Sequence, residues 1–324
     1  MEAIVKQIGA AFSVAVIPVL RDNYSYLIHD KTTGVLAVVD VSKDVAPVID
    51  CVRRISSGGS TDGLRTILCT HKHADHSGGN ITLQKQLNAF GSFRVFGGAN
   101  DNIPGVTHTV VEGDRFYVGS LQVDVLDAPC HTRGHVLYKL HNPALPKDGT
   151  ALFTGDTMFI GGIGAFFEGD AALMCRALRK IYDLNKDVTS GAPRSSGGSI
   201  RNASDCCDTA TDAVVSGAGD MVETEGEADS RTYIFPGHEY TLNFISFSRD
   251  TLPASHPDAP FVAEQLQRYT EMVEKEHRPT IPSTLAVEKR QNLFLRTCDE
   301  AFVQFMNKGN TAVELMEYLY NTCP

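Results

Sequence analysis

The sequence lacks the long hydrophobic runs and the excess of positive charge that mark two large classes of protein. No run approaches the ~18 apolar residues that a membrane-spanning helix needs. The first residues, M-E-A-I-V-K-Q-I-G at 1–9, include an early acid and no long apolar segment of the kind found in signal peptides. The net charge of −10 opposes binding to nucleic acid. We therefore expect neither a membrane nor a nucleic acid as partner.

The sequence also lacks a regular cysteine framework. Its eight cysteines are Cys51, Cys69, Cys130, Cys175, Cys206, Cys207, Cys298 and Cys323. A chain of 324 residues with 42% hydrophobic content can bury a large core without disulfide bonds. We therefore expect reduced thiols and a cytoplasmic location. Because no feature of the sequence indicates an oligomer, we also expect a monomer.

What the sequence does contain is a dense group of potential metal ligands. Residues 66–70 are short, β-branched and apolar, which predicts a buried strand. Four potential ligands follow it within six residues: His71, His73, Asp75 and His76. Neutral imidazole and carboxylate oxygen are usual ligands of zinc and iron. In an irregular loop the first two can point one way and the last two another, which suits two adjacent metals.

Three later segments repeat the pattern of a potential ligand placed just after an apolar strand. They are A-P-C-H-T-R-G-H at 128–135, A-L-F-T-G-D at 151–156 and Y-I-F-P-G-H-E-Y at 233–240. Catalytic residues commonly lie on loops at strand ends of a rigid α/β scaffold. Each segment alone would more often be structural, but together with the first motif they indicate one metal site that includes His131, Asp156 and His238.

These motifs, in this order, resemble the binuclear metal site of the metallo-β-lactamase superfamily. The segments T-H-K-H-A-D-H-S-G-G-N, G-D-T-M-F and P-G-H-E-Y-T are similar to glyoxalase II, the hydroxyacylglutathione hydrolase family. The resemblance covers nearly the whole chain. It implies an α/β fold, the metallo-β-lactamase αββα sandwich followed by a small all-α C-terminal domain. Hydrophobic periodicity by itself predicts only a mixed α/β sheet protein.

The resemblance also implies a ligand set for two divalent metal ions, zinc first, with iron or manganese as alternatives. It assigns one metal to His71, His73 and His131. It assigns the other to Asp75, His76 and His238, with Asp156 bridging the two. A hydroxide between the metals would be the nucleophile, and Asp75 and Asp156 would be the catalytic carboxylates. The expected reaction is hydrolysis of S-D-lactoyl thioesters to D-lactate and free thiol, in methylglyoxal detoxification.

Two residues near these ligands have other expected roles. His135 can either support a ligand or be purely structural, and the sequence favours neither. Cys130 precedes a ligand but has no ligand position in the family pattern, so we expect a buried structural cysteine.

The thiol site departs from the family pattern. Glyoxalase II enzymes hold the glycine carboxylate of glutathione with Lys and Tyr in a G-K-F-Y-E-G-like loop, and with R-x-x-K in the last helix. The corresponding positions here, with one retained tyrosine, are Ala165, Phe167, Tyr240, Tyr320 and Cys323. A site without these cations and donors would desolvate a free carboxylate without compensation.

These substitutions lead to a prediction about the substrate. We predict that the five residues bind a thiol whose glycine carboxylate is already amidated, as in trypanothione. The pattern resembles the trypanosomatid branch of the family. Lactoyl-trypanothione is therefore the expected small-molecule partner, with lactoyl-glutathione as the alternative.

Other functions remain open from the sequence. A lactonase, a β-lactamase or a phosphodiesterase could use the same metal site. A persulfide dioxygenase would use one iron, and the complete second ligand set argues against it. A catalytically inactive scaffold would be expected to lose ligands, and all seven are present.

The predicted elements fall into two domains, 1–240 for metal binding and 241–324 for a helical, substrate-binding domain. In the first we expect strands at 12–20, 24–28, 35–39, 93–96, 116–118 and 121–126, and helices at 45–55, 81–90 and 171–184. In the second we expect helices at 261–276, 288–305 and 311–319.

Residues 190–230 differ from the rest of the chain. They contain seven Ser, six Gly and eight acidic residues against two Arg, so they carry most of the negative charge. Such a stretch cannot bury enough apolar area to offset its ordering entropy, so we expect a disordered insertion. Cys206 and Cys207 within it are expected to be free thiols, not ligands.

Overall fold

The computed structural model describes residues 3–87, 92–186 and 223–324. Most of the predicted insertion, including Cys206 and Cys207, lies outside the described residues. No helix in the described part is long and apolar enough to cross a membrane.

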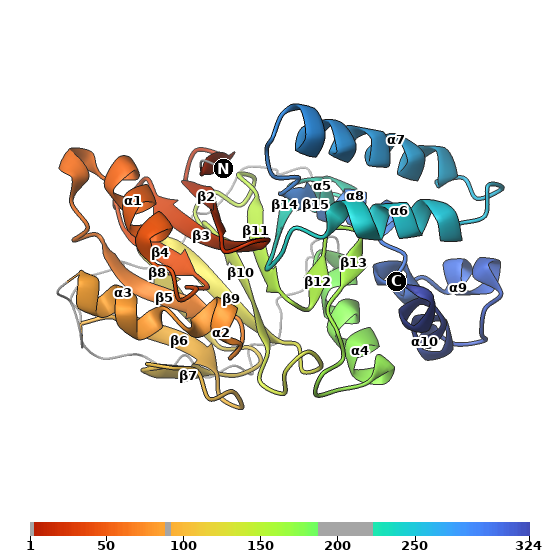
Figure 1. Ribbon diagram of the computed structural model, residues 1–324, viewed down its shortest axis with the longest axis horizontal. Helices are drawn as coiled ribbons and strands as arrows, with labels where there is room; N and C mark the ends of the chain where they lie inside the picture. Colours follow the sequence, from red (N-terminus) through yellow and green to blue (C-terminus); the bar gives the residue numbers. More distant parts are fainter. Residues whose placement is uncertain (1–2, 88–91, 187–222) are drawn as a thin grey trace.

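Two large β-sheets form the centre of the molecule (Figure 1). The first has seven strands in sequence order: β1 (Ile4–Ile8), β2 (Phe12–Val19), β3 (Asn23–Asp30), β4 (Leu36–Val39), β5 (Leu64–Cys69), β6 (Arg94–Gly98) and β7 (His108–Val110). Its strands are antiparallel up to β4 and parallel from β4 to β7.

The second sheet has six strands in the order β15-β14-β11-β10-β9-β8. They are β8 (Arg115–Val118), β9 (Leu121–Asp127), β10 (Val136–His141), β11 (Thr150–Gly155), β14 (Thr232–Pro236) and β15 (Ser283–Thr284). Only β11 and β14 pair in parallel. A small hairpin of β12 (Met158–Phe159) and β13 (Gly162–Ile163) follows β11.

Alternating residues of the first sheet pack into two separate clusters. Val14, Val16 and Tyr26 belong to the cluster that includes the second sheet. Ala15 and Ile17, which alternate with Val14 and Val16 along β2, belong to a cluster with the helices on the other face. Because side chains on a strand alternate between faces, both faces of this sheet are buried, which explains its nearly continuous hydrophobic runs.

Helices complete the layers. The part of the chain before residue 240 contains α1 (Ala46–Ile55), α2 (Ala74–Ser77), α3 (Asn80–Gln86), α4 (Ala171–Tyr182) and α5 (Glu225–Ser230). The C-terminal region contains α6 (Thr241–Thr251), α7 (Ala259–Thr270), α8 (Leu285–Gln291), α9 (Glu300–Met306) and α10 (Ala312–Thr322). Figure 1 shows the helices of this C-terminal region, coloured cyan to dark blue, at one end of the sheets. The sandwich with a helical C-terminal region agrees with the predicted fold.

The predicted single helix at 288–305 is wrong. The chain forms α8, a 3-10 turn at Leu295–Cys298 and then α9. The Asn292 side chain ends α8, because its Oδ1 accepts the backbone N–H groups of Phe294 and Leu295, both at 3.1 Å. Asp299 then caps α9 by accepting the N–H of Ala301. Local side-chain hydrogen bonds of this kind compete with a continuous helix.

The last part of the predicted insertion differs from expectation. Residues 225–230 form α5, which begins with a capping box in which Thr224 and Glu227 each bond the other's backbone N–H. The T-E-G-E sequence at 224–227 fits this motif, so the sequence contained a helix-start pattern inside the polar stretch.

Candidate metal centre

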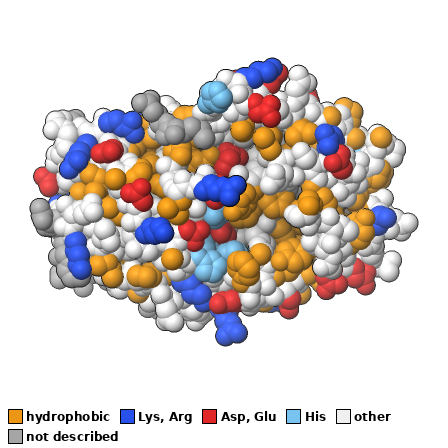
Figure 2. All heavy atoms as spheres, viewed as in Figure 1, with side chains coloured by type: hydrophobic (Ala, Val, Ile, Leu, Met, Phe, Trp, Pro, Cys, Tyr) orange, Lys and Arg blue, Asp and Glu red, His pale blue; other side chains and the backbone are white. Residues whose placement is uncertain are grey.

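All seven predicted metal ligands follow strand ends and converge on one region. His71 and His73 follow β5, and Asp75 and His76 lie on the short helix α2, whereas the sequence predicts an irregular loop there. The remaining ligands, His131, Asp156 and His238, follow β9, β11 and β14. In the space-filling view, histidine and acidic side chains gather near the middle of one face, beside hydrophobic side chains on the side of the C-terminal helices (Figure 2).

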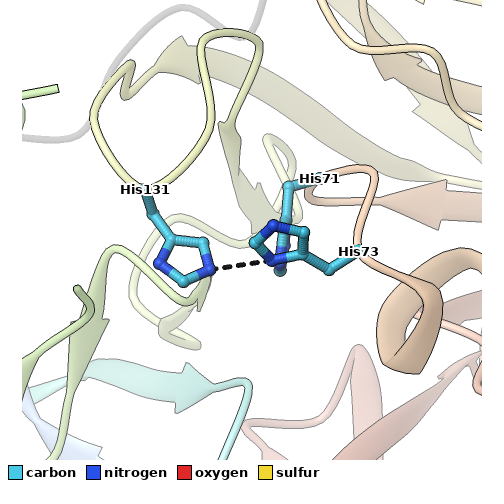
Figure 3. Close-up of side chains that lie close together, drawn as sticks. All are labelled: His71, His73 and His131. Atoms are coloured by element: carbon cyan, nitrogen blue, oxygen red, sulfur yellow. Dashed lines mark hydrogen bonds between the residues drawn. The ribbon is translucent and has the colours of Figure 1, made fainter. Parts of the chain in front are cut away.

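The first ligand group consists of three imidazoles. His73 Nδ1 lies 3.0 Å from both His71 Nε2 and His131 Nε2. Figure 3 shows the three rings converging, two from the loop after β5 and one from the loop after β9. Neutral imidazole nitrogens at these separations present lone pairs toward a common point, which is the arrangement that a bound cation requires.

The second group has one carboxylate and two imidazoles. His76 Nε2 and His238 Nε2 are 3.2 Å apart, and Asp75 Oδ2 lies 3.3 Å from the first and 3.4 Å from the second. These three ligand atoms lie within 4.8 Å of one another, as do those of the first group.

Asp156 lies between the two groups. Its Oδ2 is 3.4 Å from His131 Nε2 and 3.3 Å from His238 Nε2. Its Oδ1 is buried and has no hydrogen-bond partner among the described residues. A buried carboxylate oxygen without a partner is costly, whereas a cation at each group would satisfy it. The residues present therefore fit two metal ions.

Two glycines allow this close approach. A Cβ at Gly237 would lie 2.1 Å from Asp156 Oδ1, inside the centre itself. Gly155 has φ +47°, and a Cβ there would lie 2.5 Å from Thr70 Oγ1. Only glycine leaves room at these two positions.

Residues that the sequence analysis did not assign hold the ligands in place. His76 Nδ1 donates to Asp40 Oδ2 at 3.0 Å, and His238 Nδ1 donates to Asp22 Oδ1 at 3.0 Å. Asn23 Nδ2 donates to Asp75 Oδ2 at 2.8 Å. Such bonds fix the tautomer and the ring orientation of a metal ligand. Each of these residues lies next to the end or the start of a predicted strand, and this position is the only signal of their role that the sequence offers.

Burial and charge set the protonation of the ligands. Burial lowers the pKa of His71 well below its ordinary value, so its ring is neutral and can ligate. Burial also lowers the pKa of His238, but its interactions with the accepting carboxylates of Asp156 and Asp75 outweigh burial and raise the pKa to about 10. The second group therefore carries negative charge that a proton or a metal cation must balance.

His135 and Cys130 take supporting positions. His135 Nε2 accepts the backbone N–H of Asp156 at 3.1 Å, and its ring stacks on His71. It thus positions a ligand instead of facing the centre. Cys130 is buried, and its thiol donates to Asp170 O.

A cavity of about 410 Å³ adjoins the centre. It is lined by Phe159, Ile163, Ala165, Tyr240, Phe244, Phe294, Tyr320, Cys323 and Pro324. The Tyr240 ring stacks on His238 with centroids 4.9 Å apart, so a wall of the cavity contacts the second group. Four of the five residues predicted to bind the thiol line this cavity. Phe167 is not among them, because its side chain is 68% exposed and its ring packs against His131.

Comparisons with known proteins agree with this architecture. Residues 239–322 match the family model described as hydroxyacylglutathione hydrolase C-terminus. A metallo-beta-lactamase from Staphylococcus aureus has a similar structure, with a TM-score of 0.53 and 19% identity over 99% of this chain and 67% of that chain. The ETHE1 structure from Myxococcus xanthus gives a TM-score of 0.51 and 19% identity over 99% of this chain and 92% of that chain.

At these identities the structural likeness defines the fold. The chain has the metallo-β-lactamase fold, with a candidate centre for two metals at its ligand-bearing edge. Its C-terminal helical segment is of the hydroxyacylglutathione hydrolase type.

Proposed function

We propose that the chain is a binuclear metal-dependent hydrolase that cleaves S-D-lactoyl (2-hydroxyacyl) thioesters of trypanothione or glutathione to D-lactate and free thiol. The observation that carries the proposal is the convergence of two ligand groups on Asp156, beside a C-terminal segment of the hydroxyacylglutathione hydrolase type. Zinc is the metal that we propose, and iron and manganese are the alternatives. A cytoplasmic, monomeric enzyme acting in methylglyoxal detoxification is part of this proposal.

Two bound divalent metals would polarise the thioester carbonyl and lower the pKa of a water molecule. The chain's own residues orient the reactants. Burial and the nearby Asp22 carboxylate raise the pKa of Tyr240 to about 12, so its hydroxyl stays protonated and can donate a hydrogen bond into the cavity. A thiolate is a good leaving group, so the reaction needs no strong general acid from the protein.

The lining of the cavity favours a thiol whose glycine end carries no charge. Five aromatic rings line it, and its lining residues within the described part of the chain include no lysine or arginine. A free glycine carboxylate would lose its hydration there without a cation to replace it. This supports trypanothione, whose glycine carboxylates are amidated, as the preferred thiol.

Paired kinetics test the proposal. We expect thiol release from S-D-lactoyltrypanothione with a large preference over S-D-lactoylglutathione, in a sample that contains about two metals per chain. Comparable kcat/KM for the two substrates would leave the hydrolase and remove the thiol preference. No release from either, with metals bound, would favour another hydrolase on this centre, of the lactonase or phosphodiesterase type.

A further inference from the structure

The loop of residues 164–168 lies between the C-terminal helix α10 and the first ligand group. The backbone N–H of Phe166 donates to the Tyr320 hydroxyl oxygen at 3.1 Å. The rings of Phe166 and Tyr320 stack with centroids 3.9 Å apart and an interplanar angle of 9°. Tyr320 therefore holds this loop through both its ring and its hydroxyl oxygen.

The same loop orients a metal ligand. The carbonyl oxygen of Ala165, next to Phe166, accepts a hydrogen bond from His131 Nδ1 at 3.0 Å. This bond keeps the proton on Nδ1 and leaves Nε2 free to face His73 and Asp156. The loop has little room to shift, because a Cβ at Gly164 would lie 1.8 Å from the backbone oxygen of Asp156.

The far end of the loop is fixed to both ligand-bearing segments. Glu168 accepts hydrogen bonds from Lys72 Nζ at 2.7 Å and from the backbone N–H of Arg133 at 2.8 Å. Lys72 lies between the ligands His71 and His73, and Arg133 lies two residues after His131. The loop thus connects α10 to the segments that carry all three ligands of the first group.

We propose that Tyr320 is a positioning residue of the metal centre: by holding the 164–168 loop, it sets the orientation of His131 and the affinity of the first metal site. The inference rests on the metal centre of the proposed function but not on its substrate. Its hydroxyl oxygen accepts from the protein's own backbone, and Tyr320 also lines the cavity. A change in the position of α10 would then alter the orientation of His131 through this loop.

Metal competition with a chromophoric chelator tests this role without any thioester. Tyr320→Phe keeps the stacked ring and removes the acceptor of the Phe166 N–H. We expect zinc to bind about three- to tenfold more weakly at one of the two sites. This factor corresponds to the net free energy of one lost hydrogen bond. Glu168→Gln, which weakens the other end of the loop, should shift the same site. Tyr318→Phe is the matched control. It is the same substitution on the same helix, but at a tyrosine whose ring lies beneath the Lys308 ammonium group.

The outcomes separate the two roles of Tyr320. Zinc affinity in Tyr320→Phe equal to that of wild type, with only KM changed, would make Tyr320 a substrate contact and overturn the positioning role. Wild-type protein that binds no zinc would overturn both this inference and the proposed function. Wild-type protein with two zinc ions but no thioesterase activity would overturn the proposed function alone, and the shift in Tyr320→Phe would still decide the inference.

Discussion

At the residue scale, Asp40 connects the two ligand groups. Its Oδ2 accepts from His76 Nδ1 at 3.0 Å and from the Thr70 hydroxyl at 2.7 Å, and that hydroxyl oxygen accepts from His71 Nδ1 at 3.0 Å. One buried carboxylate therefore orients a ligand of each group. A double role of this kind makes Asp40 as important to the centre as a direct ligand.

We predict that Asp40→Asn weakens binding of both metals by about 10- to 100-fold. In the wild type both carboxylate oxygens accept hydrogen bonds, because Oδ1 accepts the backbone N–H of Thr70 at 2.8 Å while Oδ2 accepts from His76 and the Thr70 hydroxyl. The NH2 group of Asn must face one of these donors and cannot accept from it, so the orienting network is broken. Isothermal titration with zinc measures the effect. Asp50→Asn is the control, since it removes the same charge from an exposed position on α1. Equal affinities in the two variants would contradict the role assigned to Asp40.

A second residue-scale prediction concerns the thiol. Ala165→Lys places a cation at the cavity wall, where a glutathione carboxylate can pair with it. We expect Ala165→Lys with Phe167→Tyr to raise kcat/KM for the glutathione thioester about tenfold. Phe167→Tyr alone should change it little, because this side chain is exposed and lies outside the cavity lining. No gain in the double variant would show that these positions do not set specificity.

At the scale of elements, the break at Asn292 joins the helical region to the cavity. Its side-chain amide donates to the carbonyl oxygens of Phe159, at 3.2 Å, and Gly162, at 3.0 Å, in the β12–β13 hairpin. Phe159 lines the cavity and packs edge-on against His238. The residue that interrupts the predicted long helix therefore also positions a wall of the site.

We predict that Asn292→Ala lowers the free energy of unfolding by about 2–3 kcal/mol, because it leaves buried carbonyl and N–H groups without partners. Urea denaturation followed by circular dichroism measures the loss. Asn321→Ala, at an exposed position on α10, is the control and should change stability by no more than about 0.5 kcal/mol. A similar small effect in Asn292→Ala would mean that water replaces these bonds.

At the scale of the whole molecule, the two sequence-defined regions share one core. The largest hydrophobic cluster includes Val16 and Tyr26 of the first sheet, Phe153 of the second, and Phe294 and Leu315 of the C-terminal region. Hydrogen bonds between ligands and the residues that orient them span 52 residues from Asn23 to Asp75 and 216 residues from Asp22 to His238. Metal binding therefore links segments that are far apart in the sequence.

Removal of metals should lower thermal stability. Ligands that bind only the folded state at about 1,000 times Kd contribute roughly 4 kcal/mol, so we expect the unfolding midpoint to fall on the order of 10 °C with a strong chelator. Zinc addition should restore it, as differential scanning calorimetry can show. His71→Ala combined with His76→Ala should respond to neither treatment. An unchanged midpoint in fully metal-stripped wild-type protein would contradict a folded-state metal centre.

The sequence does not predict strands β1, β7, β10, β12, β13 and β15. It does predict the strands that carry the ligands, because short apolar runs such as 66–70 that end at a turn depend only on local residue order. It also determined the ligand types and their order, because imidazoles and carboxylates just after strand ends are visible in one dimension. The exposed Phe167, the break at Asn292 and the roles of Asp22, Asn23 and Asp40 could not be predicted in this way.

Those features were decided only by the tertiary structure, because each depends on partners far away in sequence. Asp40 acquires its role when β4 pairs with β5 and brings it to Thr70 and His76. Tyr320 reaches Phe166 only when α10 packs beside the loop, 154 residues away. A sequence specifies which groups are available for chemistry, but the distances and orientations that make them a site arise when separate strands and helices share one core.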